Sequence, residues 1–136
     1  MATFEQIQSS AYRLPSLDQE FLLGDSMRGI RFMLEYEKAE EALRAYGVKS
    51  TIVAFGSART RQDGPGRQNF WYEQARLFGK IASQCGGALR HYSNSHENVI
   101  ATGGGPGLME AANRGAHEAG APSIGFNITL PNEQIP

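Results

Sequence analysis

Residues 99–116 read VIATGGGPGLMEAANRGA: a short apolar run, a turn almost without side chains, and an alanine-rich segment. This order predicts a buried strand, a glycine turn and a helix over residues 107–119, the unit from which α/β proteins build phosphate sites. Glycines let backbone N–H groups approach a ligand closely, and a helix N-terminus carries partial positive charge. Pro106 suits the first helical position, where its missing N–H costs little. The turn is therefore predicted to bind an anion.

Two common phosphate-binding fingerprints are absent from this stretch. Counted from Gly103 or from Gly105, the spacing G-x-G-x-x-G meets Leu108 or Glu110 where the third glycine should stand. No Gly-Lys-Ser/Thr follows any of the glycines, so the P-loop pattern also fails. A glycine turn that serves only packing therefore remains an alternative.

Two further apolar runs, residues 51–55 and 123–128, predict strands parallel to the first. The run at 51–55 is nearly unbroken, as expected of a central strand buried on both faces. Ligands bind at the carboxyl ends of parallel strands, so the residues that follow each run are candidates for the site. Arg59 could form a forked contact with a phosphate or a ribose oxygen, or it could be a solvated loop arginine.

These elements predict an α/β, Rossmann-like fold, a parallel sheet with helices on both faces. Three parallel strands make half of a doubly wound sheet, so the sheet is expected to be incomplete in this chain. Residues 1–25 show no clear period and are predicted to be an N-terminal arm, followed by one nucleotide-binding domain over 26–136.

Two helices are predicted before the glycine turn. The first, over residues 26–46, has an apolar face that would form core or a dimer contact: Phe32, Tyr36, Ala39, Leu43 and Tyr46. The second, over residues 69–85, has a face expected to lie in the core: Trp71, Ala75, Phe78, Ala82 and Cys85. This places Cys85 as a buried structural thiol.

Three strings, GGGPGLMEAANRGA (103–116), AFGSAR (54–59) and GFNITLPNEQ (125–134), together resemble the Lonely Guy (LOG) family of nucleoside 5′-monophosphate phosphoribohydrolases, long labelled lysine decarboxylases. The match covers roughly residues 50–136 and is specific to the longer, bacterial-type branch. The resemblance implies a Rossmann-like homodimer that binds AMP-like nucleotides and hydrolyses the N-glycosidic bond to a free base and ribose 5-phosphate. In plants and some bacteria the base is a cytokinin.

The predicted substrate-binding set combines the glycine turn with the strand ends. Glu110 could reach a ribose hydroxyl from the first helical turn, or it could pair on the surface with Arg114 four residues on. Met109 could pack under a nucleobase or in the core. The full set is Gly56, Ser57, Ala58, Arg59, Gly103, Gly104, Gly105, Gly107, Leu108, Met109, Glu110 and Asn127.

One departure from the family concerns catalysis. The signature P-G-G-x-G-T-x-x-E, which carries phosphate-binding backbone and an active-site glutamate, does not occur in the 136 residues. Catalytic residues are expected after Pro136, and Glu110 is the weak candidate within the chain. A related fold occurs in molybdenum-cofactor carrier proteins, so binding without turnover is the alternative function.

Composition and single residues exclude several other functions. The formal net charge of −1 gives no electrostatic case for nucleic acid or an anionic membrane as partner. Pyridoxal phosphate chemistry is rejected because the three lysines lie on predicted helices or at their ends. The spacing of Cys85, His91 and His96 matches no common zinc pattern. The predicted reaction demands neither a metal nor an organic cofactor, so none is expected. One cysteine, no apolar run of about 18 residues and no signal-peptide pattern favour the cytoplasm.

Overall fold

The computed structural model describes residues 3–89 and 95–128 and forms two compact units, residues 1–42 and 43–136. Three short 3₁₀ turns, at Ser10–Tyr12, Pro15–Leu17 and Asp25–Met27, separate the first helices. The helices and strands are α1 (Phe4–Gln8), α2 (Gln19–Leu23), α3 (Arg28–Ala45), β1 (Thr51–Val53), α4 (Gln68–Cys85), β2 (Val99–Thr102), α5 (Leu108–Glu118) and β3 (Ser123–Gly125).

The first unit consists of short capped helices and most of α3. Thr3 forms a capping box with Gln6 at α1, and the Asp18 carboxylate accepts a hydrogen bond from the Phe21 amide at α2. α3 ends before Gly47, whose φ of +70° suits a helix stop, as predicted. None of the residues of α3 is buried, so its predicted apolar face is not core among the described residues. The alternative prediction, that this face forms a dimer contact, is not tested.

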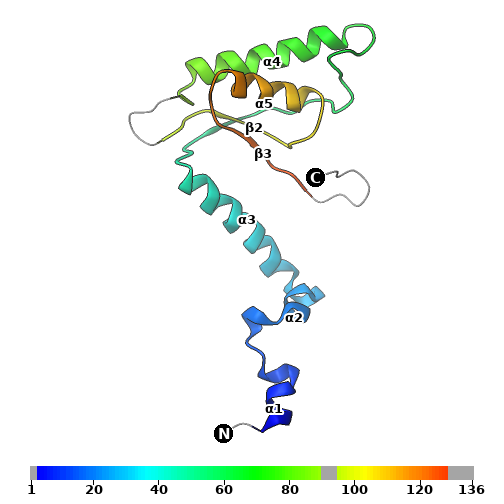
Figure 1. Cartoon of the computed structure of the whole chain (residues 1–136), viewed down its shortest axis with the longest axis vertical. Helices are drawn as coiled ribbons and strands as arrows, with labels where there is room; N and C mark the ends of the chain where they lie inside the picture. The colour runs from blue at the N-terminus through cyan, green and yellow to red at the C-terminus, as the bar shows by residue number, and fades with distance from the viewer. Residues whose placement is uncertain (1–2, 90–94, 129–136) are drawn as a thin grey trace. The chain divides into compact units, whose positions relative to one another are not determined.

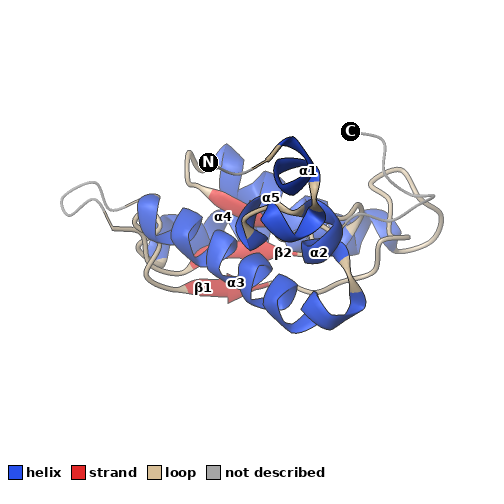
Figure 2. Ribbon diagram, turned by 90° about the horizontal axis from the view of Figure 1, so that it is seen from below, coloured by secondary structure: helices blue, strands red, loops and turns tan. Residues whose placement is uncertain are grey.

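The second unit is built on a parallel sheet of three strands in the order β1-β2-β3. Ile52 aligns with Ile100, and Ala101 with Ile124; β1 and β2 run side by side in Figure 2. This confirms the predicted α/β class with an incomplete parallel sheet.

The central strand of the sheet is β2, all four residues of which are buried. The prediction that residues 51–55 form a central strand buried on both faces is wrong, because β1 lies at one edge of the described sheet. Val53 and Phe55 are therefore exposed. The short run VIAT has no polar residue before Thr102, which fits a strand enclosed on both sides.

Helices α4 and α5 lie on the same side of the strands (Figure 1) and pack along each other. On that side Ile100 is in a cluster with Ala112 and Ala116 of α5. On the opposite side of β2, Val99 packs with Ala88 and Ala121, which lie outside the helices. In the part of the chain that the structure describes, none of the helices has both the length and the apolar character needed to cross a bilayer.

The two helices approach so closely that their backbones touch. A Cβ added at Gly79 of α4 would contact the carbonyl of Ala112 in α5. A Cβ added at Gly115 of α5 would contact the carbonyl of Arg76 and lie 2.8 Å from the Lys80 amide nitrogen. Glycine is therefore required at both positions for reasons of space.

The close approach also corrects the predicted orientation of α4. Its buried residues are Tyr72, Gly79 and Ser83, whereas Trp71 and Phe78 of the expected core face are 50% and 49% exposed. Cys85 is exposed as well, so the prediction of a buried thiol is wrong. Backbone contact with α5 is made where Gly79 and Gly115 leave no side chain between the helices, and Trp71 and Phe78 lie on the exposed side of α4.

Replacing Gly115 by alanine is expected to lower the free energy of unfolding by about 3 kcal/mol, the upper end of overpacking costs, because the new methyl group would meet backbone atoms that cannot rotate away. Urea denaturation measures the change. Gly29→Ala in α3 is the control: its Cβ would meet no atom within 4 Å, so a gain of up to about 1 kcal/mol in helix stability is expected. Equal effects of the two substitutions would contradict backbone contact between α4 and α5.

Candidate functional site

The glycine turn, residues 103–107, joins β2 to α5. Two of its glycines adopt positive φ, Gly104 at +69° and Gly107 at +77°, whereas Gly103 and Gly105 do not. Gly107 is the N-cap and Leu108 the first residue of α5. Pro106 therefore precedes the cap, and its predicted place as the first helical residue is wrong.

The turn lies against the segment that follows β1. The Leu108 amide donates a hydrogen bond to the Ser57 carbonyl at 3.1 Å, and a Cβ added at Gly107 would contact that same carbonyl. Gly56 is in turn covered by the Leu108 side chain, whose Cδ1 would lie 3.0 Å from an added Cβ. The structure thus brings the two predicted segments together and uses one helix amide to do so.

The next two amides of α5, those of Met109 and Glu110, have no hydrogen-bond partner among the described residues. Such free donors are expected in the first turn of a helix. They and the partial positive charge of the helix end are available to an anion. The Ala111 amide begins the regular helical pattern by donating to the Gly107 carbonyl at 2.9 Å.

Thr102 and Asn113 form hydrogen bonds that hold the glycine turn in place, and the sequence analysis singled out neither residue. The buried Thr102 hydroxyl oxygen accepts hydrogen bonds from the Gly104 amide at 3.0 Å and from Asn113 Nδ2 at 2.9 Å. The sequence feature that could have indicated Thr102 is a hydroxyl residue at the end of an otherwise apolar strand. Asn113 lies on the same side of α5 as Glu110, one turn further on.

The other predicted residues are distributed around the turn. Met109 lies beneath it, with its sulfur 3.4 Å from a Cβ added at Gly103. Asn127 lies beside Gly104, with a Cβ distance of 3.6 Å by the same construction. The Arg59 amide donates to the Ser57 hydroxyl at 3.1 Å. The Arg59 side chain is exposed and does not line either of the pockets described next.

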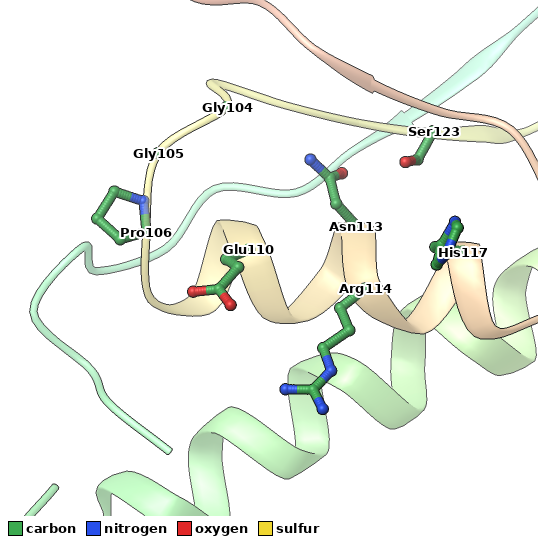
Figure 3. A pocket seen from close by; sticks show the side chains of 8 residues that line it. All are labelled: Gly104, Gly105, Pro106, Glu110, Asn113, Arg114, His117 and Ser123. Carbon is green, nitrogen blue, oxygen red and sulfur yellow. The ribbon is translucent and has the colours of Figure 1, made fainter. Parts of the chain in front are cut away.

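An open pocket of about 530 Å³ runs along α5 (Figure 3). In that view Asn113 points toward the turn and Ser123, whereas Arg114 points toward α4. His117, for which a surface position was expected, is exposed and contributes to the wall. The pocket is lined by Gly104, Gly105, Pro106, Glu110, Asn113, Arg114, His117 and Ser123.

A second pocket of about 360 Å³ lies on the side of the β1 segment. It shares Pro106 and Glu110 with the first pocket, so Glu110 stands at the boundary between them. The remaining lining residues are Ala58, Thr60, Arg61, Gln62, Asp63, Tyr72 and Gly107.

Glu110 is oriented by Tyr72, a residue that the sequence analysis did not single out. Tyr72 is only 3% exposed, and its hydroxyl donates to Glu110 Oε1 at 3.1 Å. The predicted surface pair of Glu110 with Arg114 is not among the ion pairs of the described residues; Arg114 Nε instead lies 3.2 Å from Glu118 Oε1. One oxygen of Glu110 therefore remains available to a ligand.

Glu118 joins α5 to α4 through arginines from both helices. Arg76 Nη2 of α4 lies 2.8 Å from Glu118 Oε1, and Arg76 also pairs with Glu73 at 3.1 Å. The hydrogen bond from Arg76 is the main reason why the pKa of Glu118 lies below its ordinary value of 4.5, and Arg114 adds to the shift.

No group of three potential metal ligands from His, Cys, Asp and Glu occurs among the residues that the structure describes. His91, part of the spacing considered for zinc, lies outside them. No protein-family model matches the chain, and no curated protein matches its sequence.

Replacing Thr102 by the isosteric valine should cost about 2 kcal/mol of unfolding free energy, because the Gly104 amide and the Asn113 side chain would lose their acceptor. Thermal and urea unfolding give the measurement. Thr51→Val in β1 is the matched control, since Thr51 makes no side-chain hydrogen bond within the described residues; a change near zero is expected there. A Thr102 variant as stable as the control would show that the turn does not need this oxygen.

The Glu118 ion pairs should make stability depend on pH. A carboxyl with a lowered pKa in the folded state stabilises fully above its unfolded pKa, and this contribution disappears as pH falls through the folded pKa. Glu118→Gln should therefore be least stable relative to the unsubstituted chain above pH 4.5, and the difference should shrink on further acidification. Urea denaturation across about pH 7 to about pH 3 tests this. A difference in stability that stays constant over this range would contradict a contribution from the Glu118 ion pairs.

Proposed function

We propose that this chain binds the phosphate of a purine nucleoside 5′-monophosphate at the glycine turn, as part of an enzyme that hydrolyses the N-glycosidic bond to free base and ribose 5-phosphate. The proposal depends on one observation. The backbone amides of Met109 and Glu110, in the first turn of α5, have no hydrogen-bond partner among the described residues. Backbone donors at a helix N-terminus favour an anion without need of a lysine or a P-loop. The resemblance to the Lonely Guy family supports the nucleotide and the reaction.

Hydrolysis of this bond builds positive charge on the ribose and negative charge on the departing base, so the enzyme must hold a carboxylate near the ribose and grip the phosphate rigidly. In the proposal the turn supplies the grip, since Thr102 and Ser57 fix its backbone. Glu110 contacts a ribose hydroxyl with the oxygen that Tyr72 leaves free. The family's further glutamate belongs to a motif that the 136 residues do not contain.

Binding without turnover is the second candidate function. It is supported by the small number of carboxylates at the two pockets, which are Glu110 and Asp63 among the described residues. A carrier of a phosphorylated ligand such as the molybdenum cofactor would need the phosphate grip alone. The two candidates differ in whether a base is released.

We further propose that the chain acts in the cytoplasm as a homodimer or a higher homo-oligomer. The family resemblance supports the oligomer, and the single cysteine supports a reducing compartment. Its net charge of −1 gives no electrostatic support for nucleic acid as a partner.

AMP is expected to bind at least about tenfold more tightly than adenosine, because charge-assisted hydrogen bonds to the phosphate are worth about 1.5 kcal/mol or more. Isothermal titration calorimetry on the longest available form of the protein measures both affinities, with inorganic phosphate as competitor. Glu110→Gln should keep the ratio of the two affinities, since the backbone grips the phosphate. Equal affinities would refute the phosphate site.

Release of base separates the two functions. The protein is incubated with AMP and with isopentenyladenosine 5′-monophosphate, and chromatography detects free adenine or isopentenyladenine. Free base in proportion to enzyme supports the hydrolase. Tight binding with no base released supports the carrier.

A further inference from the structure

The loop that leads from β1 to α4 forms one wall of the second pocket. This wall consists of four consecutive polar residues, 60–63, and the lining is completed by residues of α4, of the glycine turn and of α5. Tyr72 and Glu110, which are joined by a hydrogen bond, belong to it. The second pocket is therefore a polar space of about 360 Å³ beside the start of α5.

Segment 59–67 of this loop holds three arginines, which differ in what their guanidinium groups contact. The Arg67 guanidinium lies 5.1 Å from the rings of both Phe70 and Trp71. Arg59 lines neither pocket. Arg61 lines the second pocket, and its guanidinium forms no hydrogen bond or ion pair within the described residues. Arg61 thus brings an available positive charge to this pocket.

The arginine of the first pocket is already engaged. Arg114 Nε lies 3.2 Å from Glu118 Oε1, and Arg114 Nη1 donates a hydrogen bond to Gln62 Oε1 at 3.2 Å. Its side chain accordingly points toward α4 (Figure 3). An anion in the first pocket would have to compete with a carboxylate for Arg114, whereas Arg61 is available to an anion in the second pocket without such competition.

The loop around Arg61 is held in place by hydrogen bonds to side chains of α4. The Arg61 amide donates to Gln68 Oε1 at 2.9 Å, and the Gln62 carbonyl accepts from Asn69 Nδ2 at 2.6 Å. Gln62 Nε2 also donates to Glu73 Oε1 at 2.8 Å. Together with the bond from α5, these contacts make Gln62 the residue that joins the loop to both helices. A wall that is ordered in advance loses little conformational entropy when a ligand binds.

We propose that Arg61 is the side-chain contact of the ligand's phosphate, that the ligand therefore lies in the second pocket, and that Gln62 positions Arg61. This inference rests on the proposed function, which assigns the phosphate to backbone amides and to no side chain. Gly107, the N-cap of α5, lines the same pocket, so the helix end and the guanidinium border one space. A guanidinium can bind a phosphate through two parallel charge-assisted hydrogen bonds.

Isothermal titration calorimetry of the full chain with AMP and with adenosine tests the assignment of Arg61. Arg61→Gln should weaken AMP binding at least about tenfold and leave adenosine binding unchanged, because only the phosphate loses a charged partner. Arg61→Lys, which keeps the charge without the fork, should recover part of the loss. Arg67→Gln is the matched control: it removes the same charge from the same loop, but that guanidinium contacts aromatic rings, so AMP affinity should not change.

The positioning role of Gln62 is tested by combining substitutions. Gln62→Ala should weaken AMP binding about threefold or more, because Arg61 must then be ordered on binding. This effect should vanish when Arg61→Gln is already present, since a positioning residue acts only through Arg61. Gln74→Ala, on the exposed side of α4, is the control and should have no effect in either background. Losses from Gln62→Ala and Arg61→Gln that simply add would overturn the positioning role.

The failure of this inference and that of the proposed function give different results. If the unsubstituted chain prefers AMP to adenosine and Arg61→Gln binds AMP as well as Arg67→Gln does, the inference is overturned and the proposed function stands. If the unsubstituted chain binds AMP no better than adenosine, the phosphate site fails for the nucleotide, and inorganic pyrophosphate decides the rest. Pyrophosphate binding that Arg61→Gln weakens and Arg67→Gln does not would support the second pocket as a phosphate site. The lack of such a difference, or of any pyrophosphate binding, would overturn the inference as well.

Discussion

Backbone contact between α4 and α5 is the constraint on which the second unit depends. Because Gly79 and Gly115 bring the two helices together without intervening side chains, α5 can settle onto β2 through residues as small as Ala112 and Ala116. The first amide of α5, that of Leu108, donates a hydrogen bond to the Ser57 carbonyl in the segment after β1.

The candidate site follows from that placement and from two oxygens that fix the turn. Ser57 supplies a carbonyl that holds the first amide of α5, and Thr102 supplies a hydroxyl that holds Gly104 and Asn113. The donors left over are those of Met109 and Glu110, at the end of the helix where an anion is favoured. A rigid protein frame with free donors is what electrostatic binding of a phosphate requires.

The sequence predicted the parts of this arrangement that depend on neighbouring residues. The apolar runs, the breaking glycines and the alanine-rich helix each determine local structure, so the strands, α5 and the position of the turn were found. The orientation of α4 was not, because the assumption that Trp71 and Phe78 face the core fails where helices meet through glycine. Tyr72 and Glu110 are 38 residues apart, and nothing local indicates that they touch.

The same packing accounts for the different character of the two helices. Arg76 of α4 pairs with Glu118 of α5 and with Glu73, and the exposed residues of α4 are all uncharged. The side of α5 that lines the pocket keeps polar groups, Glu110, Asn113 and His117. A neutral helix surface and a polar one therefore arise on adjacent helices from one contact.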